Sequence, residues 1–299
     1  MKQFIKNIIF NIPPVRRMKE ELERYKTYHP PGHYYSPIPD KQYVRDNAGR
    51  IFDRSSKQLP GIDLRVDQQL ELVRNLSIYG SSHGLPARKQ EGFRYWFENP
   101  LFSWCDGVIL SSMMRHFKPK RIIEAGSGYS SAVMLDINEK YFNDEIDVRL
   151  IEPYPTRLNG LTKGFKQNYS ITEKFIQDLN PDFFNELQAN DILFIDSTHV
   201  SKAGSDVNFI LFELLPTLRS GVIIHFHDVF YPFEYPEEWI EKGYAWNEDY
   251  LLRAFLMYNA EFEVLLFNNF LEIHYSELLQ QYLPDALKHP GGGLWLRKK

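Results

Sequence analysis

The sequence predicts an α/β fold in which helices cover a mostly parallel sheet. The first observation behind this prediction is a regular alternation from residue 119 onward, where short apolar, β-branched runs are separated by helical patterns. Strand–helix–strand units of this kind form parallel pairs with right-handed crossovers. The second observation is that five of the apolar runs end in polar side chains, most of them acidic. Together the two observations indicate a sheet whose strand ends face a ligand.

Strands and helices are expected in alternation along this part of the chain. The strands are expected at residues 121–124, 147–152, 172–177, 192–196, 222–227, 262–267 and 294–297. The helices between them are expected at residues 130–140, 155–166, 182–188 and 201–215, and a later helix at 247–257 with Asn247 as its N-terminal cap. One further helical pattern, at residues 66–76, precedes the alternating part.

The first third of the chain reads differently from the rest. It carries a charged segment at residues 16–26 and a proline- and aromatic-rich stretch at residues 29–40, and it lacks the alternation of strands and helices. We therefore expect an N-terminal extension or cap at residues 1–95 and a ligand-binding domain at residues 96–299.

Composition excludes several classes of protein. The 299 residues carry 35 basic and 39 acidic side chains, a net charge of −4, which does not suggest a nucleic-acid partner. The single Cys105 excludes an intrachain disulfide and fits a reducing compartment, so a cytoplasmic location is expected. No apolar run approaches the ~20 residues of a membrane span. Residues 1–12 mix lysine with apolar side chains, and a helix packed on protein is preferred there over peripheral contact with a membrane.

Residues 121–131 carry the most informative motif of the chain. A β-branched run ends in Glu124 and is followed by Gly126, Gly128 and a segment that can begin a helix. Glycines allow a tight turn and a close approach of the backbone to a ligand. This geometry wraps a nucleotide-like cofactor, so the fold is expected to be Rossmann-like. Ser131 stands where a dinucleotide-binding fold has a third glycine.

The strand-end residues suggest what kind of ligand is bound. Glu152 lies 24 residues after Gly128, close to the spacing at which an acid binds a ribose diol. Asp178 is expected to accept a hydrogen bond from the exocyclic amine of a base. Glu124 and Asp196 flank the glycine turn and are expected to hold a cationic ammonium group. A positively charged ligand such as S-adenosylmethionine suits these acids better than a pyrophosphate does.

Six segments resemble those of the class I S-adenosylmethionine-dependent methyltransferases, and in particular those of one bacterial family. They are residues 34–40, 123–131, 194–199, 225–230, 232–236 and 246–248. The resemblance implies a three-layer sandwich around a seven-stranded sheet whose last strand inserts antiparallel. It also implies that S-adenosylmethionine is the cofactor, bound around Glu124, Gly126, Ser127, Gly128, Tyr129, Glu152, Gln177, Asp178 and Asp196.

Histidines near the last parallel strands are the candidates for catalysis. Methyl transfer to a hydroxyl group needs a base that removes its proton, and an unperturbed histidine titrates at about 6.5. Alternation along the strand puts His225 and His227 on one face, with His227 nearer the carboxyl end. We expect His227 to be the general base and Asp228 to orient it or to bind the substrate. His199 is the second candidate for the base.

The acceptor is expected to be a hydroxyl group of a small molecule or a saccharide. Two aromatic-rich stretches, at residues 33–39 and 230–246, are expected to shape its pocket and to exclude water. Tyrosine and tryptophan side chains suit the faces of sugar rings.

Three alternatives to this interpretation stay open. A metal ion is the feature that the hydroxylase alternative would need, and enough possible ligands are present in Asp196, His199, His225, His227 and Asp228. However, Val229 stands where metal-dependent O-methyltransferases have an asparagine, and no obligatory metal is expected. The first alternative is an iron-dependent hydroxylase and the second is an NAD-dependent enzyme on the same sheet. The third is a binding module without catalytic activity.

Overall fold

A computed structural model describes residues 12–24 and 26–299, and the chain divides into two compact units. The larger unit holds residues 52–236 and 246–299, and the smaller one holds the residues up to 51 together with residues 237–245. Residues 52–95, which the sequence analysis assigns to the extension, thus group with the sheet. Most of the segment expected to pack on protein, residues 1–11, lies outside the described residues. Within the described part, no helix has the length and apolar character needed to cross a membrane.

The smaller unit is made of short helices. Asp40 caps one of them by accepting hydrogen bonds from the backbone N–H groups of Gln42 and Tyr43. Arg45 on this helix forms a bidentate ion pair with Glu241, at 2.8 Å for both contacts, which ties two distant parts of the chain together. The helices are α2 (Pro13–Arg24), α3 (Lys41–Asp46), α4 (Ala48–Ile51) and α10 (Glu237–Lys242).

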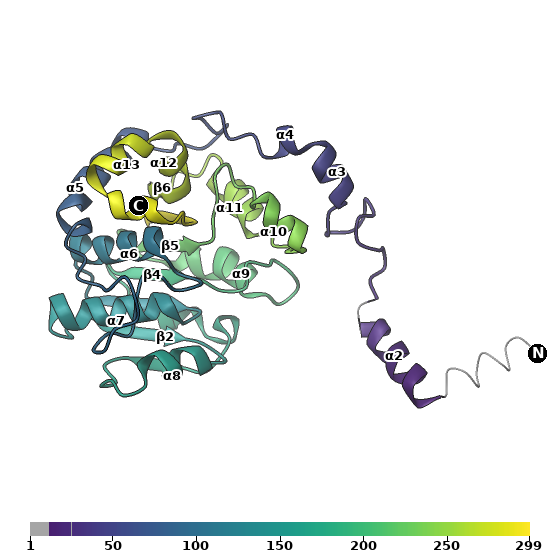
Figure 1. The fold of residues 1–299 in the computed structure, drawn as a ribbon, viewed down its shortest axis with the longest axis horizontal. Helices are drawn as coiled ribbons and strands as arrows, with labels where there is room; N and C mark the ends of the chain where they lie inside the picture. Colours follow the sequence, from purple (N-terminus) through teal and green to yellow (C-terminus); the bar gives the residue numbers. More distant parts are fainter. Residues whose placement is uncertain (1–11, 25) are drawn as a thin grey trace, which may run out of the picture. The chain divides into compact units, whose positions relative to one another are not determined.

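A seven-stranded sheet forms the centre of the larger unit (Figure 1). Its order is β3-β2-β1-β4-β5-β7-β6, and the first five strands in this order pair in parallel. The antiparallel β7 lies between β5 and β6, so the expected sheet is confirmed. The strand order reverses between β1 and β4, where open parallel sheets bind ligands. The strands are β1 (Arg121–Ala125), β2 (Asp147–Ile151), β3 (Ser170–Thr172), β4 (Ile192–Ile195), β5 (Ile223–His227), β6 (Phe262–Phe267) and β7 (Gly293–Lys298).

Helices cover both faces of this sheet. Every residue of β4 and β5 is buried, which requires cover on both sides. Helix α6 packs between α5 and α7, and α7 also packs against α8 and β2 (Figure 1). The helices of the larger unit are α5 (Val66–Gly80), α6 (Trp104–Phe117), α7 (Tyr129–Phe142), α8 (Thr156–Thr162), α9 (Asp206–Phe209), α11 (Glu248–Leu256), α12 (Asn268–His274) and α13 (Ser276–Tyr282).

Three expected elements are shorter than the sequence pattern indicates. The third strand ends at Thr172 rather than near 177, because the exposed Glu173 and Lys174 leave the edge of the sheet, and residues 176–178 form a 3₁₀ turn. The helix expected at 182–188 is only a 3₁₀ turn, Pro181–Phe184. The helix expected from 201 begins at Asp206, after Gly204 adopts a φ of +72° and Ser205 caps the first turn.

Helices α6, α12 and α13 were not expected from the sequence. Ten of the 14 residues of α6 are buried, including Cys105, Asp106 and two serines. A helix surrounded by protein carries no polar stripe, so its sequence lacks the periodicity that marks a surface helix. Helix α12 begins directly after β6, with no turn residues between the two elements to signal the change.

Candidate functional site

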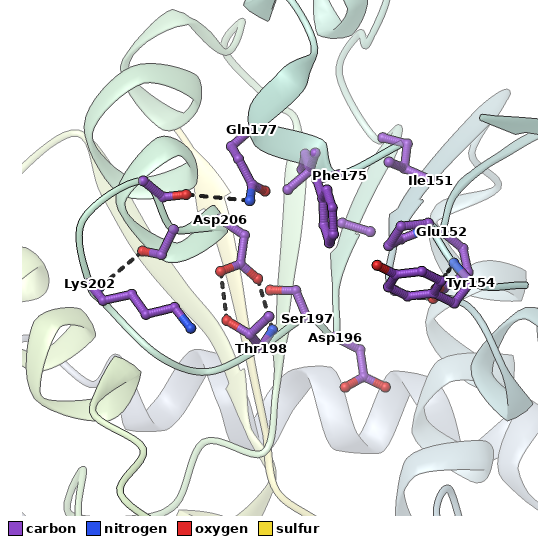
Figure 2. A pocket seen from close by; sticks show the side chains of 16 residues that line it. Ile151, Glu152, Tyr154, Phe175, Gln177, Asp196, Ser197, Thr198, Lys202 and Asp206 are labelled. Atoms are coloured by element: carbon purple, nitrogen blue, oxygen red, sulfur yellow. Dashed lines mark hydrogen bonds between the residues drawn. The ribbon is translucent and has the colours of Figure 1, made fainter. Parts of the chain in front are cut away.

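Two neighbouring cavities open at the carboxyl ends of β1, β2 and β4. The larger has a volume of about 360 Å³ and the smaller about 240 Å³. Because four residues line both cavities, we describe them as two halves of one site. The shared residues are Gly126, Glu152, Asp196 and Ser197. Figure 2 shows the side chains around the larger cavity.

The glycine turn is held between two strands. Gly126 has a φ of +84°, and a Cβ built on it would lie 1.7 Å from the carbonyl oxygen of Asp196. Its N–H donates to the carbonyl of Ile151 at 3.0 Å. Position 126 therefore requires glycine for its backbone conformation and for space. Gly128 is extended, with a φ of −178°, and a Cβ there would meet only the flexible side chain of Arg157, at 3.2 Å.

Glu124 is fully buried and lines neither cavity. Its carboxylate accepts hydrogen bonds from the hydroxyl groups of Ser130 and Ser131 in the first turn of α7. Burial raises the pKa of Glu124 to about 8, despite these two hydrogen bonds. Ser131 also accepts from the N–H of Gly128 at 3.0 Å, which explains a serine at the third glycine position. This placement favours a structural role for Glu124, whereas Asp196 lines both cavities.

Glu152 organises the wall that both cavities share. One carboxylate oxygen accepts from the N–H of Ser127 at 3.0 Å, and the other accepts from the N–H of Tyr154 at 2.8 Å. Ser127 and Tyr129 line the smaller cavity, together with Gly128. The structure thus brings together most of the residues predicted to bind the cofactor.

The far end of the larger cavity is mostly apolar. Phe175 and Tyr154 meet edge to face there, with ring centroids 5.9 Å apart (Figure 2). Gln177 lines the cavity, and its Oε1 is buried with no hydrogen-bond partner among the described residues. Asp178, predicted to bind a base, is exposed and does not line the cavity. The 3₁₀ turn that replaces the end of the expected strand accounts for this difference.

The side chains predicted for catalysis meet where β4 and β5 end. The Nε2 of His199 lies 3.6 Å from Asp196 Oδ1 and 3.8 Å from Asp228 Oδ2. The Nε2 of His227 lies 3.6 Å from Asp228 Oδ1. The side chains of Asp196 and Asp228 are 30% and 22% exposed, whereas those of both histidines are 5% exposed. Phe102, which lines the smaller cavity, has its ring 5.1 Å from that of His227.

The charges of this group act on one another. Burial opposes the charged form of His227, but Asp228, Asp196 and Asp106 outweigh burial and raise its pKa. Burial would also raise the pKa of Asp196, but His227 and His199 outweigh burial and lower it. His225, by contrast, lies between Phe194 and Trp295 in the core. Burial holds the pKa of His225 well below its ordinary value, so this histidine is neutral.

Sequence reasoning missed three acidic residues at this site. Asp106 on α6 has a pKa raised by burial to about 7. Glu248 and Asp249, on α11, are both buried, with Glu248 Oε2 2.9 Å from His199 Nδ1 and Asp249 Oδ2 3.1 Å from the N–H of Phe230. The only signal for Glu248 was its place in the 246–248 segment. Asn247 does not cap α11 with its side chain as expected; its Oδ1 accepts from the N–H of Ser201 instead.

Sequence reasoning also missed Asp206, which lines the larger cavity. The carboxylate of Asp206 accepts from the N–H of Thr198 at 2.8 Å and from its hydroxyl at 2.6 Å (Figure 2). These bonds fix the loop that follows β4. Over residues 12–24 and 26–299, no three His, Cys, Asp or Glu side chains are grouped so as to hold a metal ion.

Comparison with known proteins adds to this geometry. A family model for a methyltransferase domain matches residues 123–229, from β1 to the end of β5. An uncharacterised protein of Archaeoglobus fulgidus is 35% identical over 166 residues, which cover 54% of this chain and 74% of that protein.

Two solved structures are similar at low identity. The methyltransferase PaMTH1 of Podospora anserina, bound to S-adenosylhomocysteine, has 19% identity and a TM-score of 0.42 over 88% of this chain and 99% of that one. The O-methyltransferase TomG of Streptomyces achromogenes, in complex with S-adenosylmethionine, has 12% identity and a TM-score of 0.41 over 86% and 95%. Likenesses of this size say nothing about the substrate of this chain. The matched methyltransferase domain and the strand order together place the chain among the class I S-adenosylmethionine-dependent methyltransferases.

Proposed function

We propose that this protein transfers the methyl group of S-adenosylmethionine to a hydroxyl group of a small molecule or a saccharide, with His227 as the general base. The observation that carries the proposal is the shared wall of the two cavities. This wall runs from the glycine turn through Glu152 to Asp196 and ends beside two histidines. The site therefore combines acids suited to a cationic, adenosine-bearing ligand with a base.

The larger cavity fits the adenosine part of the cofactor. Its apolar end, with Phe175 and Tyr154, suits a purine ring. The unpartnered Oε1 of Gln177 is an acceptor for the exocyclic amine, in place of the Asp178 suggested by the sequence. Glu152 would accept from the ribose hydroxyls with the lone pairs that its two backbone hydrogen bonds leave free.

The smaller cavity fits the amino-acid part of the cofactor. Asp196 lines it, and its lowered pKa keeps the carboxylate ionised, as binding of an ammonium group requires. The ring of His227 lies 5.1 Å from that of Phe102, which lines this cavity. The cofactor supplies a methyl group on a sulfonium centre. The chain's own task is to align the acceptor oxygen in line with that group and to take up its proton.

His227 is assigned as the base because three carboxylates raise its pKa. A stronger base removes a hydroxyl proton more readily, provided that it is neutral when the acceptor binds. The rate should therefore rise with pH as His227 loses its proton, through a pKa above the ordinary 6.5, and then level off. Asp228, 3.6 Å from Nε2, would hold the imidazolium after the proton has moved.

The test is a His227→Asn variant, assayed for methyl transfer to a panel of hydroxyl acceptors. Loss of the base should lower kcat by about 10²- to 10⁴-fold. Affinity for S-adenosylhomocysteine, measured by calorimetry, should stay close to wild type. The matched control is His116→Asn, which should keep full activity. His116 lies in the last turn of α6, whereas Phe102 precedes the first turn of this helix. Near wild-type turnover of His227→Asn, or a pH-independent wild-type rate, would overturn the assignment.

A further inference from the structure

We propose that Glu248 is a positioning residue that holds His199 as a fixed cation between the carboxylates of Asp196 and Asp228. This inference rests on the proposed function, since it assigns separate roles to the two histidines of the same site. In this arrangement His199 orients the two acids that face the cofactor and acceptor, and it takes no proton from the acceptor.

The Nδ1 side of His199 is held by α11. Glu248 is 1% exposed, and its Oε2 lies 2.9 Å from Nδ1. The backbone N–H groups of Asn247 and Glu248 both donate to the carbonyl of His199, at 3.1 and 3.2 Å. The ring of Trp246 lies over the imidazole, with centroids 4.4 Å apart. The side chain and backbone of His199 are thus fixed by one segment, in a left-handed conformation with a φ of +59°.

The Nε2 side faces two more acids. Asp196 Oδ1 is 3.6 Å away and Asp228 Oδ2 is 3.8 Å away. A neutral imidazole carries one N–H and would direct a lone pair at a carboxylate on one of its two sides. With carboxylates on both edges, the doubly protonated ring is the form that satisfies the geometry. Without that cation, Asp196 and Asp228 would repel each other.

Four carboxylates among the described residues support this balance. The strand ends contribute Asp196 and Asp228, α11 contributes Glu248 and Asp249, and the positive charge of His227 opposes it. Burial alone would lower the pKa of His199, but the nearby carboxylate of Asp196 and the hydrogen bond with Glu248 outweigh burial and raise the pKa well above its ordinary value. A His199 held as a cation takes no proton from the acceptor, which is consistent with the role of general base proposed for His227.

The contacts of each side chain fit this division of labour. Asp196 and Asp228 are 30% and 22% exposed and lie 3.6 and 3.8 Å from His199 Nε2, whereas the side chain of His199, like that of His227, is 5% exposed. His199 therefore acts through the two carboxylates. Glu248 acts only through His199.

The experiment compares Glu248→Gln with wild type in two measurements. The first is the titration of the His199 ring by ¹⁵N NMR, with no ligand or acceptor present. The wild-type ring should stay doubly protonated from pH 6 to 8, and the variant ring should titrate within that range. The second is turnover. In the variant, kcat should fall by about 10- to 100-fold, as loss of a charge-assisted hydrogen bond implies, and kcat should fall further as pH rises.

Two further variants keep the test decisive. Glu248→Asp preserves the carboxylate and should restore the protonated ring and part of the lost turnover. Glu263→Gln is the matched control, because Glu263 is a largely buried carboxylate that pairs with Arg65 at 2.7 Å and lines neither cavity. It should change neither the His199 titration nor the rate. If Glu248→Gln does not fold, the wild-type titration carries the test by itself, because a neutral His199 at pH 7 overturns the inference.

Either of two results would overturn the inference: a wild-type His199 that is neutral at pH 7, or a Glu248→Gln variant with lower thermal stability but unchanged titration and pH profile. The NMR result does not depend on the methyl acceptor. Failure of wild type to bind S-adenosylhomocysteine would instead contradict the proposed function. The NMR titration would still establish the charge state of His199.

Discussion

Acidic residues at neighbouring strand ends turn out to differ sharply in their surroundings. Glu124 has no exposed surface and bonds to two serines of α7, whereas Glu152 and Asp196 line the cavities. The sequence could place all three at strand ends, because apolar runs locate the strands. It could not tell which carboxylate points into the protein. That depends on Ser130 and Ser131, which form the first turn of α7 over Glu124.

Glu124 should make the stability of the fold depend on pH. Its pKa is about 8 in the folded protein, above the 4.5 of a free glutamate. The folded state thus holds a proton that the unfolded chain releases, and stability should fall as pH rises from 4.5 through 8. In Glu124→Gln this fall should be smaller by a few kcal/mol, on the order expected from the pKa difference. Urea unfolding at pH 5 and pH 8 measures the free energy of unfolding of both proteins. An equal change in this free energy between the two pH values would contradict the role of Glu124.

At the scale of elements, the turn between β1 and α7 fixes the geometry of the site. The carbonyl of Ala125 accepts from the N–H of Asp196 at 2.9 Å, and the Gly126 N–H bonds to the end of β2. Three strand ends therefore meet at one glycine. A motif with two glycines predicted this turn correctly, but only the structure distinguishes the two positions, because Gly126 alone has a positive φ and a backbone atom against it.

The two glycines should respond differently to alanine. Gly126→Ala forces a Cβ against the Asp196 carbonyl in a left-handed conformation, and we expect a loss of at least about 1–3 kcal/mol of stability. In Gly128→Ala the new Cβ contacts only the Arg157 side chain, and the free energy of unfolding should stay within about 1 kcal/mol of wild type. Thermal unfolding of both variants without ligand measures the difference. Equal losses would show that the strain at Gly126 is relieved elsewhere.

Most of the strands were predicted well, including the fully buried β4 and β5, but the buried helix α6 was not. Residues 262–267 were predicted as a strand with the observed bounds, and the antiparallel last strand is confirmed. The buried α6 was missed because packing on all sides removes the periodicity of its sequence. Glu248 was missed for another reason: it is 49 residues from His199 in sequence, and nothing local to either residue specifies that pair.

At the scale of the whole molecule, ligand binding should stabilise the larger unit. All the residues that line the two cavities belong to this unit, and all but Leu101 and Phe102 come from segments that end or follow the four strands β1 to β4. A ligand that binds only the folded form should add about 2.7 kcal/mol at a concentration 100-fold above its Kd. S-adenosylmethionine and S-adenosylhomocysteine should therefore raise the melting temperature, while NAD should not. A shift with NAD and none with the two adenosyl compounds would favour the nicotinamide alternative.

The strand order has a consequence for how the protein is made. The N–H of Asp228 donates to the carbonyl of Gly292 at 2.8 Å, and β7 then enters the gap between β5 and β6. Both neighbours of β7 are synthesised before it. A nascent chain that still holds residues 292–298 inside the ribosome thus lacks the anchor for Asp228 and leaves two strand edges open. The corner that carries the reactive acids can close only when this late segment has emerged from the exit tunnel.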